Sequence, residues 1–354
     1  MTRPDQTRPD HPIVRKQERN SSLELLRIVA MLMIVTYHFS SHGGFNFPTD
    51  SITLNRLYFQ FTRIFGALGN DIFVMLAGYF LVKSESTKIL KLFNLWLRIF
   101  FYSVICYCVF VFLGYKIFSP IRLLKSMMPI SHRLYWFPTV YLVLYVLHGW
   151  LNIFLHRLTH EEYKKFLLTL FILWSVIPAL LPSNFEGSHL TQFIFLYSLA
   201  GYFRLWEKDF GSRRFILYGI IFIAVNYSTA IIFDIIGLKI KFFAVKAEHF
   251  YMMVMPLTIC ASLCFLLGFR SLKIPHSKVI NTIASAAFGV YLIHDNGFVR
   301  PFLWREVFRN ASFQNSPYLI PYSLAVILTV YISCTIIELL RSKIFRTLTR
   351  CYLS

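Results

Sequence analysis

The run LELLRIVAMLMIVTYHFS at residues 23–40 is apolar along most of its length. At about 1.5 Å per residue, it is long enough to cross most of a bilayer core. Among its ionisable side chains, Arg27 and His38 stand out, because such groups are costly inside a membrane and therefore indicate a functional role. The run predicts a membrane-spanning helix that carries functional groups. No small-residue cleavage site follows it, so we expect a retained anchor rather than a cleaved signal peptide.

The rest of the chain repeats this apolar pattern. Hydrophobic residues make up 56% of the sequence and charged residues 15%, whereas soluble domains carry about 25% charged residues. The mean hydropathy is +0.56. We therefore predict an all-α integral membrane protein with about ten transmembrane helices, at residues 23–40, 64–82, 95–115, 135–155, 166–181, 191–206, 215–236, 251–269, 279–299 and 318–340.

The net charge of +19 comes from basic residues in short loops between the apolar runs. This distribution argues against a nucleic-acid partner and is typical of how membrane proteins fix their orientation. Lys and Arg are more frequent in the loops that lie on the same side of the membrane as the N-terminus, which predicts two cytoplasmic termini and an even number of helices. We expect a multi-pass protein of the plasma membrane. We expect a basic cytoplasmic tail at 1–22, one transmembrane domain at 23–340 and a cytoplasmic tail at 341–354.

Arg27 and His38 share one face of the first helix. Eleven steps of about 100° bring the second residue to within about 20° of the first. Glu24 lies one turn before Arg27, at a spacing that favours an ion pair. An extended anionic cofactor could lie along this face in a passage, with phosphate at Arg27 and its reactive end at His38. The alternative interpretation is that both are interface residues whose side chains reach water.

Two more ionisable residues are expected at the depth of His38. Asp71 lies in the outer half of the second run, and His294 lies toward the end of the ninth. A contact with Asp71 would orient the His38 imidazole and stabilise its protonated form, as in general-base catalysis. The alternatives are a helix-start residue for Asp71 and an interface cap for His294. No cysteine–histidine pattern typical of a metal site is present, so we predict no metal.

Four motifs, in this order and spacing, resemble those of the membrane acyltransferase-3 family over roughly residues 20–340. The first is an Arg and a His separated by ten residues in the opening helix. The others are a second-helix signature, a Trp-Phe segment and a late Tyr-Leu-Ile-His motif, and in this chain they read Asn70-Asp71-Ile72-Phe73-Val74-Met75-Leu76-Ala77-Gly78-Tyr79, Tyr135-Trp136-Phe137 and Tyr291-Leu292-Ile293-His294.

The resemblance implies a ten-helix membrane O-acyltransferase. It implies acyl-CoA, by preference acetyl-CoA, as a cytosolic donor, and a surface polysaccharide, lipid-linked sugar or related glycan as the hydroxyl acceptor. Together with the residue analysis, it gives three predicted groups: a catalytic group of His38, Asp71 and Arg27; a donor-binding group of Arg27, Glu24, Lys88, Lys91 and Arg98; and an acceptor-binding group of His294, Tyr291 and Trp136.

The sequence departs from the family pattern at two places. Ala77 stands where the family usually has Ser, so a hydroxyl role is absent there. Lys88 and Lys91, with Arg98 further on, replace an Arg-rich pair after the second helix. Lysine offers positive charge to CoA phosphates but lacks the two-pronged geometry of arginine.

Two other functional classes fit a ten-helix chain with intramembrane charges. One is a transporter or flippase of polysaccharide or lipid-linked sugar that performs no acyl transfer. We see no paired repeats or matched Gly/Pro-broken helices, which many transporters contain. The other is a membrane sensor or scaffold, in which Arg27 and His38 would be structural.

Overall fold

The computed structural model describes residues 19–84, 86–181, 187–207 and 209–353, and in residues 349–353 it describes the backbone alone. This part of the chain is helical and contains no β-strand. The predicted tail at 1–22 lies almost entirely outside the described residues. The predicted fold class, an all-α membrane protein, is confirmed.

Each of the ten apolar runs forms a helix. The fifth run is irregular, because α6 continues through a π-helical turn, Ile172–Val176, into α7, Ile177–Leu180. Three short helices lie in the connections: α4 (Pro120–Met127), α10 (Lys241–Val245) and α13 (Val299–Pro301). The main helices are α1 (Ser21–His42), α2 (Leu54–Leu81), α3 (Ile89–Phe112), α5 (Trp136–Arg157), α6 (His160–Phe171), α8 (His189–Leu205), α9 (Arg214–Gly237), α11 (Pro256–Arg270), α12 (Lys278–His294) and α14 (Leu319–Leu353).

Eight helical segments among the described residues are long and apolar enough to cross a membrane. The helices α8 and α12 have 17 residues each and fall just short of the required length. Two boundaries differ from the prediction by ten residues or more. Helix α2 begins at Leu54 rather than at residue 64, because the Thr53 side chain caps its first turn. Helix α14 continues through most of the predicted tail at 341–354.

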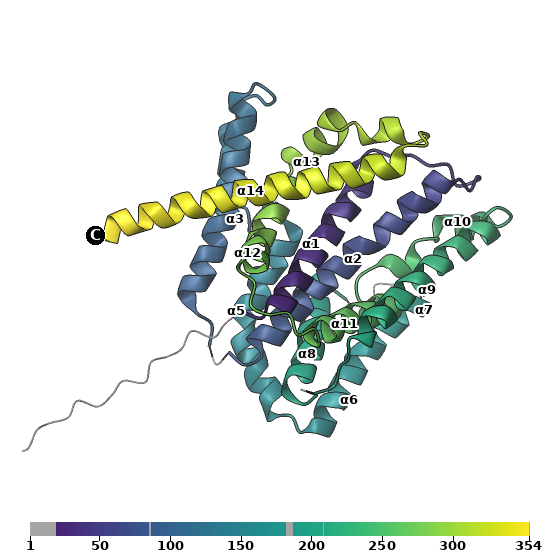
Figure 1. Ribbon diagram of the computed structural model, residues 1–354, viewed down its shortest axis with the longest axis horizontal. Coiled ribbons are helices and arrows are strands. Elements are labelled where there is room, and N and C mark those ends of the chain that lie inside the picture. Colours follow the sequence, from purple (N-terminus) through teal and green to yellow (C-terminus); the bar gives the residue numbers. More distant parts are fainter. Residues whose placement is uncertain (1–18, 85, 182–186, 208, 354) are drawn as a thin grey trace, which may run out of the picture.

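Helix α1 lies inside the bundle and packs against α2, α11, α12 and α14 (Figure 1). Small residues permit the close approach of α1 and α2. A β-carbon added at Gly69 would lie 2.7 Å from the carbonyl oxygen of Ala30, too close for any larger residue. Close helix contacts through glycine are typical of membrane bundles. The polar face of α1 is therefore surrounded by protein rather than by lipid.

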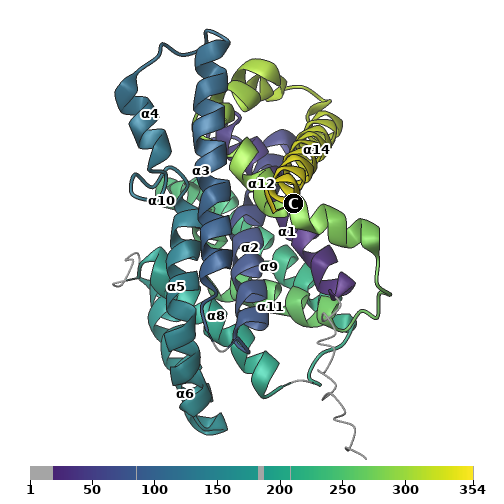
Figure 2. The ribbon, with the colours of Figure 1, turned by 90° about the vertical axis from the view of Figure 1, so that its left-hand side faces the viewer.

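The outer helices present apolar side chains outward. Helices α3, α9 and α14 carry many large exposed hydrophobic residues, and Figure 2 shows α3 and α4 as a hairpin at the edge of the molecule. An apolar surface of this extent indicates contact with a membrane or another protein. In an all-helical chain with eight candidate spans, we interpret it as the surface that faces lipid.

One buried ion pair joins α2 to the peripheral helix α9. The Arg56 guanidinium lies 2.5 Å from a carboxylate oxygen of Asp234. Arg56 is 4% exposed and Asp234 is fully buried. Arg56 also donates to the carbonyl of Ser51 in the segment before α2. These contacts hold α9 against the start of α2.

Candidate functional site

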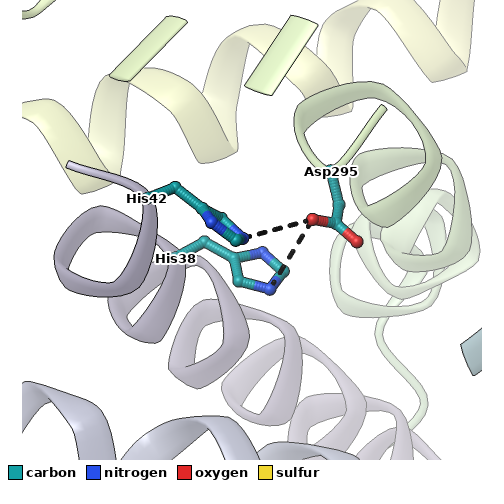
Figure 3. A group of neighbouring side chains, drawn as sticks. All are labelled: His38, His42 and Asp295. Carbon is teal, nitrogen blue, oxygen red and sulfur yellow. Dashed lines mark ion pairs between the residues drawn. The ribbon is translucent and has the colours of Figure 1, made fainter. Parts of the chain in front are cut away.

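The site forms where the end of α1 meets the end of α12. Positions i and i+4 lie on one side of a helix, so His38 and His42 project together from the last turns of α1. Helix α12 ends at His294, and Asp295 follows as its C-terminal cap. Figure 3 shows the two imidazoles of α1 side by side, with the Asp295 carboxylate across from them. His38, His294 and Asp295 are all buried.

A chain of hydrogen bonds fixes which ring nitrogen carries the hydrogen in each of the two buried histidines. His294 Nδ1 lies 2.6 Å from the carbonyl oxygen of Val290. A carbonyl can only accept, so this nitrogen carries the hydrogen, and Nε2 of the neutral His294 ring has a lone pair. That Nε2 lies 2.8 Å from His38 Nδ1, which must donate to it. In the neutral state, His38 therefore keeps its lone pair on Nε2, the atom that can accept a proton.

Asp295 is the carboxylate nearest to this atom. Its Oδ1 lies 3.8 Å from His38 Nε2 and 3.5 Å from His42 Nε2. Arg300 Nη1 lies 3.3 Å from the same oxygen. A carboxylate at this distance favours the protonated imidazole. Asp295 can therefore stabilise the charge that His38 gains when it takes up a proton.

The contact predicted between Asp71 and His38 is wrong. Asp71 is fully buried, but its Oδ2 accepts a hydrogen bond from the backbone N–H of Val254, 3.3 Å away. Within the described residues, no hydrogen bond or ion pair joins Asp71 to His38. Helix α2 turns the Asp71 side chain toward the segment before α11. Two residues at one depth can still face different neighbours.

A cavity of about 800 Å³ opens beside the histidines. His38, Tyr291 and Trp136 all line it, so the structure brings together these three predicted site residues. The ring centroids of His38 and Tyr291 are 6.2 Å apart. Trp136 is 4.7 Å from the ring of His189 on α8. His294 lies behind His38, with no place among the lining residues, and this favours a positioning role over the predicted contact with an acceptor.

Sequence reasoning missed several groups around the cavity. Arg63 lines it and pairs with Glu248 at 2.5 Å, a contact between segments far apart in the chain that no sequence signal could indicate. Asp295 received no role, although it directly follows the Tyr-Leu-Ile-His motif. The sequence does hold a signal for His42, because this residue lies one helical turn after His38 and therefore on the same face of the helix.

The chain matches the family model Acyl_transf_3, described as an acyltransferase domain, over residues 20–338. The chain belongs to this acyltransferase family. No curated protein and no solved structure matches it. The family match covers both α1 and the end of α12, so the histidine pair lies entirely within the acyltransferase domain.

The residues predicted to hold a donor lie away from the cavity in this acyltransferase. Arg27 pairs with Glu24 at 2.5 Å, which confirms the expected i,i+3 contact. Arg27 is not among the lining residues of the cavity, and it lies within electrostatic range of Tyr141, a half-buried residue of α5. The cavity beside His38 therefore does not extend to Arg27.

A series of aromatic contacts links α5 to the histidines beside the cavity. Tyr141 stacks on Phe137 with ring centroids 6.3 Å apart. Phe137 is in turn 5.8 Å from Tyr291, which contacts the His38 ring. These ring contacts join Tyr141 of α5 to His38 of α1 through Phe137 and Tyr291. A donor arm would have to displace some of these rings to reach the imidazole.

The three basic residues of α3 fall into two groups. Lys88 and Lys91 are exposed at the start of the helix, where the Lys88 backbone hydrogen-bonds to Tyr145 of α5. Arg98 is half-buried and lies 3.7 Å from Glu338 of α14. Tyr141 and Tyr145 are one turn apart on α5, so Lys88 and Arg27 approach the same helix at neighbouring turns.

Proposed function

We propose that the protein is a membrane O-acyltransferase that moves an acyl group, by preference acetyl, from acyl-CoA to a hydroxyl of a glycan. His38 Nε2 is the general base. The observation that carries this proposal is the hydrogen-bond chain from Val290 through His294 to His38, which leaves the Nε2 lone pair free. His38 also lines a cavity of a size suited to a small-molecule acceptor, about 300–1,000 Å³ in typical sites.

The reaction is a direct transfer. His38 Nε2 takes the proton of the acceptor hydroxyl as its oxygen attacks the thioester carbonyl. The new C–O bond forms and the C–S bond breaks, and the imidazolium then returns its proton to the CoA thiolate. Asp295 stabilises the imidazolium through its charge, while His294 holds the ring. In this mechanism Asp295 and His294 take the role that the sequence assigned to Asp71.

The acceptor enters the cavity. Its wall offers aromatic rings at Trp136 and Tyr291, whose broad apolar faces with polar edges suit the faces of sugar rings. The Arg63–Glu248 pair supplies both a donor and an acceptor of hydrogen bonds to hydroxyl groups. A surface polysaccharide or a lipid-linked sugar is the acceptor class that we propose.

The donor approaches from the opposite end of α1. Lys88 and Lys91 are exposed there and can contact the phosphates of CoA. Arg27 lies further inward, and its partner Glu24 sets the direction of the guanidinium. The pantetheine arm then follows the line of Tyr141 and Phe137 toward His38, which requires these rings to change rotamer. Arg98 is held by Glu338 and contributes less to this path.

The test uses the purified full-length protein in lipid nanodiscs with acetyl-CoA labelled in its acetyl group. The wild type should transfer label to glycan acceptors and release free CoA thiol. His38→Ala should lower transfer by about 10²–10⁴-fold, the usual contribution of a general base. His132→Ala, an exposed histidine outside the cavity, serves as the matched control. A folded His38→Ala protein with near-normal turnover would refute the mechanism, and glycan movement without CoA would favour a transporter.

A further inference from the structure

We propose that the same cluster binds a divalent transition-metal ion such as Zn²⁺ through His38 Nε2, His42 Nε2 and Asp295 Oδ1, and that the bound ion inhibits the enzyme. The inhibition rests on the proposed function, because the ion would occupy the atom that accepts the proton. The binding site itself does not depend on that function. This proposal departs from the expectation of no metal, because its ligands come from two helices that the sequence alone could not bring together.

The geometry of the three ligand atoms fits one small ion. All three lie within 4.8 Å of one another, and Asp295 Oδ1 is 3.8 Å from His38 Nε2 and 3.5 Å from His42 Nε2. Zinc bonds to histidine and carboxylate ligands are about 2.0–2.2 Å long, so an ion between these atoms needs only a small inward movement. Imidazole and carboxylate together suit zinc and similar ions.

The surrounding hydrogen bonds prepare His38 as a ligand. A metal ligand must offer a lone pair, and the His294 contact already places the lone pair of His38 on Nε2. Histidines that bind metals usually donate their other ring N–H to a fixed partner, as His38 does to His294 and as His294 does to the Val290 carbonyl. No deprotonation of a neutral His38 is needed before the ion binds.

His42 supplies the second ligand and the route of entry. Two histidines at i and i+4 on one helix face form a frequent metal-binding pair. The His42 side chain is 25% exposed, whereas those of His38 and Asp295 are 7% and 5% exposed. An ion can therefore reach His42 first and then move inward to the buried pair.

The positive charge of Arg300 opposes metal binding and lowers the affinity of the site for the ion. Its Nη1 lies 3.3 Å from the same Asp295 oxygen that would bind the metal. Its positive charge repels a cation and competes for the carboxylate. The Arg300 side chain is 38% exposed, so it can swing toward solvent when an ion binds. Removal of this charge should tighten metal binding, and this gives a variant whose effect is opposite to the loss of a ligand.

The binding test titrates Co²⁺ into the full-length protein in nanodiscs, follows the visible ligand-field absorption, and then displaces the ion with Zn²⁺. We expect one ion per chain. His42→Ala and Asp295→Asn should weaken binding by at least about tenfold to 100-fold, the loss seen even when a residue that only orients a ligand is removed. Arg300→Gln should tighten it by about threefold to tenfold, since the loss of a nearby charge is worth about 1 kcal/mol. The exposed-histidine control His132→Ala should leave binding unchanged.

Each result bears on the proposal. Absence of binding, or binding that is the same in His42→Ala, Asp295→Asn and Arg300→Gln, would overturn the site and assign the metal to surface histidines. Because Arg300→Gln removes no ligand, its tighter binding would support the site even where Asp295→Asn fails to fold.

The inhibition test measures acetyl transfer at rising Zn²⁺ in the wild type and in Arg300→Gln. The half-inhibitory concentration should shift between the two proteins by the same factor as the Co²⁺ affinity. Metal binding without loss of transfer, or with a gain, would overturn the inhibition. A protein that binds the ion but transfers no acyl group under any condition would refute the proposed function while supporting the metal site.

Discussion

His294 holds His38 across the interface of α1 and α12, with 2.8 Å between His294 Nε2 and His38 Nδ1. The second histidine is itself held by the Val290 carbonyl one turn earlier on α12. The orientation and the tautomer of the reactive imidazole therefore depend on a helix near the other end of the chain. This relationship makes His294 a positioning residue for the proposed reaction.

Replacement of His294 should lower turnover without abolishing it. His294→Leu removes the acceptor for His38 Nδ1–H, so the imidazole loses its fixed orientation. We expect kcat to fall, but by less than the loss of about 10²–10⁴-fold expected when the base His38 is removed. The KM for the acceptor should change little. The glutamine variant His294→Gln should recover part of the loss, since an amide oxygen can accept the same hydrogen bond. Steady-state transfer rates should fall from the wild type to His294→Gln and further to His294→Leu. Equal rates in the wild type and His294→Leu would show that His294 does not position His38.

Loss of the two exposed lysines at the start of α3 should weaken donor binding. Lys88→Gln/Lys91→Gln should raise the KM for acyl-CoA by about threefold to tenfold, because exposed ion pairs are each worth up to about 1 kcal/mol. The kcat should stay close to that of the wild type. The control is Lys116→Gln/Lys125→Gln, which removes two exposed charges near α4. If both double variants change the KM equally, the effect is one of net charge and the proposed donor site is wrong.

The buried pair of Arg56 and Asp234 should be important for stability. Arg56→Met leaves the buried Asp234 carboxylate without its positively charged partner, which should lower the free energy of unfolding by about 3–5 kcal/mol. The double variant Arg56→Met/Asp234→Asn removes the stranded charge and should be less destabilised than the single variant. Thermal unfolding in detergent compares the two proteins. A double variant less stable than Arg56→Met would show that the unpaired charge is not the cause.

Gly78 should tolerate no side chain. A β-carbon at this position would meet the backbone of Tyr197 on α8, which cannot move aside. Gly78→Ala should therefore destabilise the protein by about 1–3 kcal/mol, as overpacking does. Gly149→Ala is the matched control within helix α5, because its nearest neighbour would be at an ordinary 3.6 Å. This control should be neutral or slightly stabilising, since alanine favours the helix; equal losses in both variants would contradict the packing argument.

Local patterns were sufficient to predict much of the fold. Long apolar runs predicted all ten main helices, because a chain in lipid must satisfy its backbone hydrogen bonds within each helix. The pair of Arg27 and Glu24 was predictable for a similar reason, since an i,i+3 spacing fixes the distance inside one helix. The start of α2 was missed because residues 54–63 contain polar side chains that tertiary contacts such as the Arg56–Asp234 pair accommodate.

The choice of partner for His38 depended on the tertiary structure. From the sequence, Asp71 and His294 were both expected at the depth of His38, yet only His294 reaches it, and Asp295 rather than Asp71 supplies the carboxylate. The contacts that join Tyr141 and Phe137 of α5 to Tyr291 and His38 could not be predicted from the sequence either, because they connect separate helices.

The sequence alone determined which residues form the main apolar helices and which side chains share a face of one helix, because helical periodicity is a local property of the chain. Only the packing of α1 against α12 decided that His38, His42, His294 and Asp295 meet, because the rotation of each helix about its axis is set by contacts between distant segments.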